Sequence, residues 1–387
     1  MISKPIPHEE TIQEFVELPD REFLHKIANE EFSSEQDLLS VIKSYSPDLK
    51  DAEGLDQLLA GYFPTIRREH FFTSTLPFIQ SMLKKTHFLL KSKIPILKQN
   101  ENFMLTLSQD QACCILANAF MCTWPHKGAR AQRANVETSK LNRINFTNLL
   151  SLANPHEFAK LACIINYFNR MHDRSEMGFP AGSLTFERRS YENKTGLEST
   201  KSKSDSNFNI PDWKTDKTIL NFTETFVEVA GEGRTIEEER DALQTIFANK
   251  QIGGGCLSIG EHQEEIRFIG SPELICASLF TEELDDNEVI LVTGSERFNA
   301  VSGYGPTMRF NGNYYSATNI DCYHRRVRQI LMMDALNVKK LGIESVEQFS
   351  EENVFREINK VYLGCRLSSE LVDSLGEDGG KVRLPRL

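Results

Sequence analysis

The spacing of apolar residues separates a helical first half of the chain from a second half in which strands and helices alternate. In residues 9–60, apolar residues recur at helical spacing among many acids, which predicts short helices with a solvated acidic face. A lysine-rich helix is predicted over 70–99, and a buried helix over 107–124 with Ser108 as its N-cap. A further apolar helix is predicted over 157–171.

The pattern changes after residues 190–216, a polar stretch rich in Ser, Lys and Asn that predicts a flexible insert. Beyond it, alternating or short apolar runs predict strands at TILNFTETFVEVA (218–230), ALQTIFAN (242–249) and EVILVTGSE (288–296). Helices are predicted at 263–283 and 323–342. Strands that alternate with helices indicate a sheet covered by helices, and 387 residues suggest two or three structural units.

The net charge of the chain and its distribution limit the kinds of partner that it can bind. The chain carries a formal charge of −11, but 1–60 holds 14 acids and 5 bases whereas 81–145 holds 10 bases and 3 acids. An acidic chain is a poor candidate for gripping a nucleic-acid backbone through bulk charge. There is no 18-residue apolar run and no secretory signal, so we expect neither a membrane span nor secretion. The eight cysteines form no C-x-x-C pair, which predicts reduced, buried thiols and no metal site.

The strongest candidate chemistry is a glycine run followed by paired glutamates. Gly253, Gly254 and Gly255 permit a tight turn and close approach of backbone amides to a phosphate. Glu264 and Glu265 open a predicted helix and are candidates for acid–base catalysis on a glycosidic bond. Adjacent side chains on a helix point in directions that differ by about 100°, so we expect the two glutamates to have different tasks. The residues alone equally allow an ordinary flexible loop and glutamates that favour a first helical turn.

The string GGG-CLSIGEH-QEE-IRFIGSPEL, residues 253–274, resembles the signature of the poly(ADP-ribose) glycohydrolase family. Similar segments stand before and after it in the family's order: LSQDQACCILANAFMCTWP (107–125), RINF (143–146), TIEE (235–238), FAN (247–249), LFTEELDDNEVILVTGSE (279–296), SGY (302–304), RRVRQILMMDAL (325–336) and REINKVYLG (356–364). The resemblance covers roughly residues 70–364, apart from the polar insert.

The resemblance implies an α/β fold, with a macrodomain-like mixed sheet flanked by helices and an N-terminal helical accessory region. It also implies hydrolysis of the ribose–ribose O-glycosidic bonds of poly(ADP-ribose), releasing ADP-ribose without a metal or organic cofactor. Carried over by position, Glu265 is the general acid and Glu264 holds ribose hydroxyls. The glycines 253–255 wrap the diphosphate with backbone amides.

The adenosine end of the substrate follows from the same resemblance. Tyr304 matches a tyrosine that stacks on the adenosine part, Ile236, Glu237 and Gln263 match residues at the adenine edge, and Asn249 matches a ribose-contacting asparagine. Taken without the family, Tyr304 is equally a loop aromatic, Asn249 a turn former and Glu237 one of a run of solvated acids.

Two departures from the family bear on activity. Ile246 stands where the family carries an aspartate that supports the ribose site, which predicts weaker positioning. Similarity stops near Gly364, before a second glycine-rich phosphate loop, and the tail 365–387 does not resemble the family's continuation. We therefore expect a C-terminally divergent or truncated form, such as a product of alternative splicing, with an incomplete sheet and marginal stability. A catalytically weak or inactive ADP-ribose-binding, regulatory form is the alternative function.

The predicted organisation is an acidic, helical or partly disordered segment (1–69), a helical accessory region (70–189), a flexible polar insert (190–216), a macrodomain-like catalytic region (217–364) and a divergent tail (365–387). The expected partners are poly(ADP-ribose) and ADP-ribosylated proteins, with no membrane and no sequence-specific nucleic acid. The expected state is a monomer in the nucleus or cytoplasm, with a place in the DNA damage response.

Overall fold

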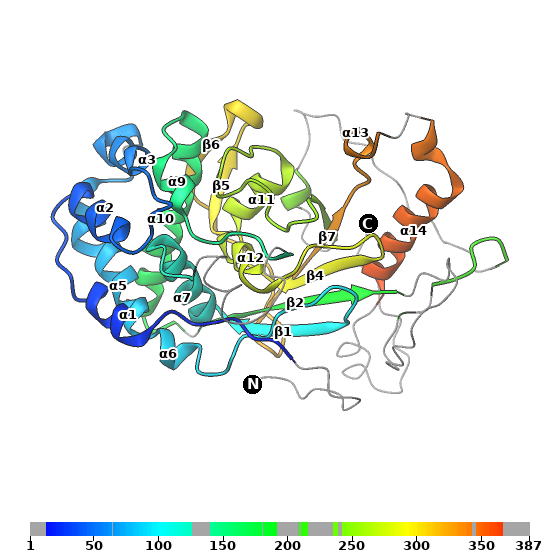
Figure 1. Cartoon of the computed structure of the whole chain (residues 1–387), viewed down its shortest axis with the longest axis horizontal. Coiled ribbons are helices and arrows are strands. Elements are labelled where there is room, and N and C mark those ends of the chain that lie inside the picture. The colour runs from blue at the N-terminus through cyan, green and yellow to red at the C-terminus, as the bar shows by residue number, and fades with distance from the viewer. Residues whose placement is uncertain are drawn as a thin grey trace.

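A mixed sheet with helices on both faces forms the centre of the molecule (Figure 1). The computed structural model describes residues 13–63, 65–125, 140–179, 181–191, 208, 210–215, 235–238, 242–342 and 346–366. The order of the five strands is β1-β2-β4-β7-β3, and a separate hairpin pairs β5 with β6. The strands are β1 (Phe103–Ser108), β2 (Ser183–Ser190), β3 (Leu243–Ala248), β4 (Glu288–Gly294), β5 (Asn299–Ser302), β6 (Arg309–Asn313) and β7 (Arg326–Asp334).

Helices account for most of the remaining described residues. The α-helices are α1 (Arg21–Ile27), α2 (Glu35–Lys43), α3 (Glu53–Gln57), α4 (Arg68–His70), α5 (Leu76–Lys84), α6 (Thr86–Leu89), α7 (Gln109–Phe120), α9 (Thr147–Ser151), α10 (Pro155–Glu176), α11 (Gln263–Gly270), α12 (Ala277–Phe280), α13 (Val338–Leu341) and α14 (Glu351–Cys365). Short π-helical turns are η1 (Leu58–Tyr62) and η2 (Phe71–Thr75), and 3₁₀ turns are η4 (Ile236–Glu238), η5 (Pro272–Cys276), η6 (Gly305–Thr307) and η7 (Glu347–Phe349).

The sheet combines antiparallel and parallel pairing. β1 pairs with β2, β2 with β4 and β4 with β7 in antiparallel fashion, whereas β3 runs parallel to β7. A large apolar core lies on the face that carries Ile330 and Met332, and it includes buried side chains of α7, α10 and α11. On the other face, Leu363 of α14 packs in a smaller core with Leu331. The predicted fold class, a mixed sheet flanked by helices with a helical N-terminal region, is confirmed.

The predicted buried helix over 107–124 starts as expected. Strand β1 ends at Ser108, whose hydroxyl accepts a hydrogen bond from the Gln111 backbone N–H, while the Gln111 side chain bonds back to the Ser108 N–H. This reciprocal capping box satisfies two backbone donors that a helix start leaves free. Ser108 is thus confirmed as the N-cap of α7, although the apolar residues before it belong to a strand.

The predicted helix over 323–342 is wrong over its central part, which is the strand β7, and only the short helix α13 near its end is helical. Ile330, Leu331 and Met332 are all buried, since β7 has neighbours at both edges and apolar cores on both faces. A strand buried on both sides has a continuous apolar run, which periodicity alone cannot distinguish from a buried helix.

Other predicted elements met different outcomes. The single helix predicted over 70–99 is broken into α4, η2, α5 and α6 and ends at Leu89. Strands β1 and β2 were not predicted, although they join the strands of the second half in one sheet. The predicted strand at 218–230, most of the polar insert and nearly all of the tail lie outside the described residues. Of the helices in the described segments, none has the length and apolar character that crossing a bilayer requires.

Candidate active site

The predicted site is built where β3 leaves the sheet. After Ala248 the chain turns, passes through the glycine loop 253–260, and enters α11 at Gln263. This path places Glu264 and Glu265 in the first turn of α11, facing the loop that precedes it. Both side chains are buried, with exposures of 3% and 5%.

The Glu264 carboxylate is held by three neutral donors. Its Oε2 accepts hydrogen bonds from the backbone N–H of Asn249 at 2.9 Å and from the Asn249 amide at 2.6 Å, and its Oε1 accepts from the Gly253 N–H at 2.8 Å. Burial raises the pKa of Glu264 to about 7, since desolvation outweighs these hydrogen bonds and the neighbouring Glu265 charge adds to the effect. Near neutral pH this group can therefore hold or release a proton.

The Glu265 carboxylate has a different set of neutral donors. Its Oε1 accepts from the Gly255 N–H and its Oε2 from the His262 N–H, both at 2.9 Å. The second bond belongs to the capping box that starts α11. Because the two glutamates contact different parts of the loop, they are suited to different tasks.

Glycine is required in the loop because the carboxylates occupy the space a side chain would need. A Cβ on Gly254 would lie 2.4 Å from Oε1 of Glu265 and 2.7 Å from Oε2 of Glu264. A Cβ on Gly260 would lie 2.6 Å from the same Glu265 oxygen. Gly253 and Gly254 also have φ values of 94° and 48°, which L side chains rarely adopt.

The three glycine amides all have partners within the protein. The N–H groups of Gly253 and Gly255 donate to Glu264 and Glu265, and the Gly254 N–H donates to the Gln251 carbonyl at 3.1 Å. The role of these amides in wrapping a diphosphate stays a prediction. In the present arrangement they hold the two carboxylates in place.

The three residues predicted at the adenine edge line one narrow hollow, which has no room for a water molecule in this structure. Its lining is Ile236, Glu237, Gln244, Thr245, Ile246, Gln263 and Arg267. Gln263 joins α11 to β3, because its amide donates to the Thr245 carbonyl and accepts from the Phe247 N–H, both at 2.9 Å. Ile246, at the position of the expected aspartate, is 2% exposed.

Arg267 in this hollow was not predicted as a site residue. It is buried, its guanidinium donates to the Gln244 side chain, and Nη1 lies 3.9 Å from Oε1 of Glu237. Burial lowers the pKa of Arg267 to about 9, and Glu237 opposes that shift. Arg267 thus faces Glu237 across the hollow, which fixes where that carboxylate can point.

Tyr304 lies close to the start of α11. Its ring is 57% exposed and meets the His262 ring edge-on, with 5.7 Å between centroids. The next residue, Gly305, donates its N–H to the Glu261 carbonyl at 3.1 Å. These contacts bring the predicted adenosine-stacking ring to the segment that carries the two glutamates.

Sequence reasoning also missed Lys160 on α10. Its side chain is fully buried, and its ammonium donates to the carbonyls of Gly255, at 3.3 Å, and Ser258. Burial lowers the pKa of Lys160. A single lysine inside the apolar run FAKLACII was the available signal, but only the fold brings it under the glycine loop.

A second contact from α10 reaches the same loop. Nε2 of His156 lies 2.7 Å from the buried Glu157 carboxylate and 3.3 Å from that of Glu261. Within the part of the chain that the structure describes, no three His, Cys, Asp or Glu side chains gather in a group that could hold a metal ion. Two carboxylates in the first turn of α11, beside a loop braced by α10, can transfer protons and accept hydrogen bonds.

Comparison with known proteins gives one consistent result. Two sequence models of the poly(ADP-ribose) glycohydrolase family match, one for its helical domain over residues 64–188 and one for its macro domain fold over residues 210–375. Poly(ADP-ribose) glycohydrolase 1 of Arabidopsis thaliana is 32% identical over 307 residues, which are 77% of this chain and 50% of that protein.

Further relatives agree with this match. Probable poly(ADP-ribose) glycohydrolase 2 of the same plant is 30% identical, over 71% of this chain and 49% of its own. Poly(ADP-ribose) glycohydrolase 1 of Caenorhabditis elegans is 30% identical over 57% of this chain and 26% of its own. The chain thus spans about half the length of the Arabidopsis relatives that it matches.

Proposed function

The chain belongs to the poly(ADP-ribose) glycohydrolase family, and on this premise we propose that it hydrolyses the ribose–ribose O-glycosidic bonds of poly(ADP-ribose). The products are ADP-ribose and a shortened polymer. The observation that supports this most is the pair of buried carboxylates beneath the glycine loop, bonded only to neutral donors among the described residues.

Glu265 is the proposed general acid. Its proton passes to the bridging oxygen as the bond from that oxygen to the anomeric carbon breaks, which leaves an oxocarbenium-like ribose. A water molecule then adds to the anomeric carbon and returns its proton to the Glu265 carboxylate. Both Glu265 oxygens accept backbone hydrogen bonds here, so the protonated group gives up one of them and donates to the substrate instead.

Glu264 is proposed to hold the ribose whose bond is cleaved. A carboxyl group with a pKa of about 7 is present in both protonation states near neutrality, so it can accept from one hydroxyl and donate to another. The same group is anchored by Asn249 and Gly253, which fixes its position before substrate arrives.

The remaining substrate contacts are proposed from position. The glycines 253–255 lie against the diphosphate, Tyr304 stacks on the adenosine, and Ile236 and Glu237 meet the adenine edge. Gln263 and Asn249 already bond to β3 and Glu264, which supports a role in shaping the adenine and ribose pockets. The same proposal includes three further points. The substrate is polymer attached to ADP-ribosylated proteins, the chain is a monomer, and it acts in the nucleus or cytoplasm during the DNA damage response.

A weak or inactive ADP-ribose-binding form is the second candidate. The observation that favours it is Ile246, an apolar buried side chain where the resemblance places a supporting aspartate. This form keeps the adenine hollow and the two glutamates and differs only in turnover.

The test is release of ADP-ribose from purified poly(ADP-ribose) by the wild-type chain and by Glu265→Gln. Glu176→Gln serves as control, because this glutamate is largely exposed at the end of α10. Release by wild type and the control, with a loss of about 10² to 10⁴ in Glu265→Gln, supports the proposal. Equal release by all three contradicts the role of Glu265. No release from any of them, with ADP-ribose still bound, favours the second candidate.

A further inference from the structure

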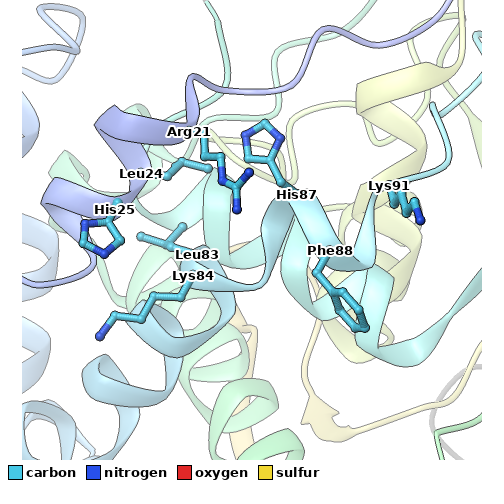
Figure 2. A pocket seen from close by; sticks show the side chains of 8 residues that line it. All are labelled: Arg21, Leu24, His25, Leu83, Lys84, His87, Phe88 and Lys91. Carbon is cyan, nitrogen blue, oxygen red and sulfur yellow. The ribbon is translucent and has the colours of Figure 1, made fainter.

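A second hollow lies on the N-terminal helical part of the molecule, formed by α1 and the α5–α6 corner (Figure 2). Its volume is about 280 Å³. The residues that line it are Arg21, Leu24, His25, Leu83, Lys84, His87, Phe88 and Lys91. Leu24 and Leu83 are buried and give it an apolar floor, whereas the other six supply two histidines, three permanent cations and an exposed aromatic ring. We refer to it as the α1–α6 pocket.

The cations of this pocket have no ionic partners among the described residues. Between described residues, no ion pair includes Arg21, Lys84 or Lys91, although such pairs are common elsewhere in the same part of the chain. The acids on the same turn of α1 are Asp20 and Glu22. The Asp20 carboxylate is engaged in accepting the Phe23 N–H at 2.9 Å. Three cations that line one hollow, none with a close ionic partner among the described residues, favour an anionic ligand.

An aromatic ring at the same place points to a nucleotide. Phe88 is 78% exposed, so its ring is accessible to a ligand. Cations beside an exposed aromatic side chain are the combination that binds single-stranded nucleotide polymers, since phosphates meet the cations and a base stacks on the ring. A volume near 280 Å³ holds one base or one ribose phosphate but not a whole ADP-ribose unit.

The α1–α6 pocket is separate from the glutamate site. α1 and α6 lie at one end of the molecule, whereas α11 lies over the sheet (Figure 1). No residue of the pocket belongs to the segments 235–265 or 302–307 that form the glutamate site. A ligand that reaches both places must therefore be a chain of several units.

We infer that the α1–α6 pocket binds an adenosine phosphate unit of the poly(ADP-ribose) chain at a distance from the bond being cleaved. This inference rests on the proposed function for the identity of the polymer. The polymer is anionic at every unit and carries an adenine in each, so it matches both the cations and Phe88. The pocket then acts as a second anchor that raises the affinity for long chains and leaves the chemical step unchanged.

The experiment compares Arg21→Gln/Lys84→Gln/Lys91→Gln with a control of equal charge change, Lys43→Gln/Lys50→Gln/Arg67→Gln. The control cations are exposed and lie on the same helical part outside the pocket. Binding of length-sorted poly(ADP-ribose) is measured in a Glu265→Gln background, so that the polymer stays intact. We expect the pocket variant to bind long chains about tenfold more weakly than the control does. Its slope of log affinity against log salt should be smaller by about 2, as expected for three lost phosphate contacts.

Phe88→Ala tests the stacking contribution separately. Because the ring is exposed, its removal leaves the core intact, and we expect affinity for long chains to fall about fivefold or more. Binding of monomeric ADP-ribose should stay the same in every variant. An unchanged affinity for long chains in both the triple variant and Phe88→Ala overturns the inference.

Two further readouts separate this inference from its rivals. If single-stranded oligo(dA) of matched length competes as well as poly(ADP-ribose), the pocket is a general nucleic-acid site and the inference is wrong. Turnover is measured in the otherwise wild-type chain, where a failure to release ADP-ribose from short and long chains alike contradicts the proposed function. The binding comparison does not depend on turnover, so it still decides whether the pocket holds the polymer.

Discussion

The carboxylates of the glycine loop differ from most other buried carboxylates of this protein in what holds them. On the opposite part of the sheet, Glu288 is paired with Arg188, and both side chains are fully buried. Glu296 is paired with Arg174 at 2.6 Å, and Asp334 with Lys360 at 2.6 Å. The first pair joins β2 to β4, the second joins the loop after β4 to α10, and the third joins β7 to α14.

Glu264 and Glu265 have backbone and amide donors in place of such cations. The difference shows in the pKa values. Burial acts to raise the pKa of Glu296, but the hydrogen bond and charge of Arg174, together with the charges of the neighbouring arginines, outweigh burial and lower it. Burial raises the pKa of Glu264 to about 7. A cation fixes a carboxylate in its charged form, and neutral donors leave it able to carry a proton. The comparison therefore separates carboxylates fixed by a cation from Glu264 and Glu265, which only neutral donors hold among the described residues.

Glu273 is intermediate between the two groups. It is fully buried and accepts from the Gln109 amide at 2.8 Å and from the Glu296 N–H at 3.2 Å. Burial, with the Glu296 charge as the second cause, raises the pKa of Glu273 to about 8. It packs inside the core against α7, away from the glycine loop, so a raised pKa alone does not mark a catalytic group.

The largest expected effect is on stability and comes from breaking a buried pair between a carboxylate and a cation. Glu288→Gln leaves the Arg188 guanidinium buried without a countercharge, and we expect the free energy of unfolding to fall by about 3–5 kcal/mol. Glu265→Gln removes no cation partner and should cost only about 1 kcal/mol. Denaturant titration of both variants measures the contrast, and equal losses would remove the distinction between the two groups.

The next effect concerns the fit between glycine and carboxylate. Gly254→Ala places a Cβ against both glutamates and forces a left-handed backbone on alanine, so ADP-ribose release should fall about a hundredfold. Gly270→Ala at the end of α11 is the control, because a Cβ there meets nothing within 4 Å. Steady-state rates report the result. Full activity in Gly254→Ala would show that the loop does not position the carboxylates.

A smaller effect is expected in the pH dependence of stability. The pKa of Glu264 is about 7 in the folded chain and 4.5 as an ordinary glutamate, so folding favours its protonated form. This contribution is fully present below pH 4.5 and is lost as the pH rises through 7. Relative to Glu264→Gln, the wild-type free energy of unfolding should decline by on the order of 2 kcal/mol over that interval.

Glu273→Gln extends the same test to the core. The pKa of Glu273 is about 8, so the loss should continue to higher pH than for Glu264. The relevant observation is the difference between wild type and each variant in urea unfolding from pH 4 to pH 9, the range that spans both groups. Parallel curves for wild type and Glu264→Gln would show that folding leaves the pKa of Glu264 at its ordinary value of 4.5.

The smallest effect on turnover is expected at Lys160, which is compared with Lys360, another lysine that is fully buried in the described part of the chain. Lys160→Met removes the ammonium that bonds to the loop carbonyls of Gly255 and Ser258, and we expect kcat/KM to fall about tenfold with partial recovery in Lys160→Arg. Lys360→Met breaks the pair with Asp334, so it should lower stability and leave turnover per folded molecule unchanged. The reverse pattern would mean that Lys160 only supports the fold.

The sequence was most informative where signals are local. A capping serine followed by an acid and a long apolar stripe predicted the start of α7, and a glycine run before paired glutamates predicted the loop and helix of the site. Both depend on residues within about a dozen positions of one another, so spacing is sufficient. The family fold followed from the resemblance that these segments carry.

Features made by distant segments were not accessible to the same reasoning. Lys160 reaches the loop only because α10 packs against it, and no pattern around residue 160 shows that contact. Strand β7 was mistaken for a helix because its two buried faces remove the alternation. The glycine amides were predicted to face a ligand, but their hydrogen bonds to the glutamates depend on side-chain placement that a motif does not contain.

The central claim is that Glu264 remains protonatable near neutral pH because burial raises its pKa and because, among the described residues, neutral donors and not a cation hold it. The most direct test is an NMR titration of ¹³C-labelled glutamate carboxyl groups, with the Glu264 signal assigned by its absence in Glu264→Gln. The account predicts a midpoint near pH 7 for Glu264. A midpoint at or below the ordinary value of 4.5 would contradict it.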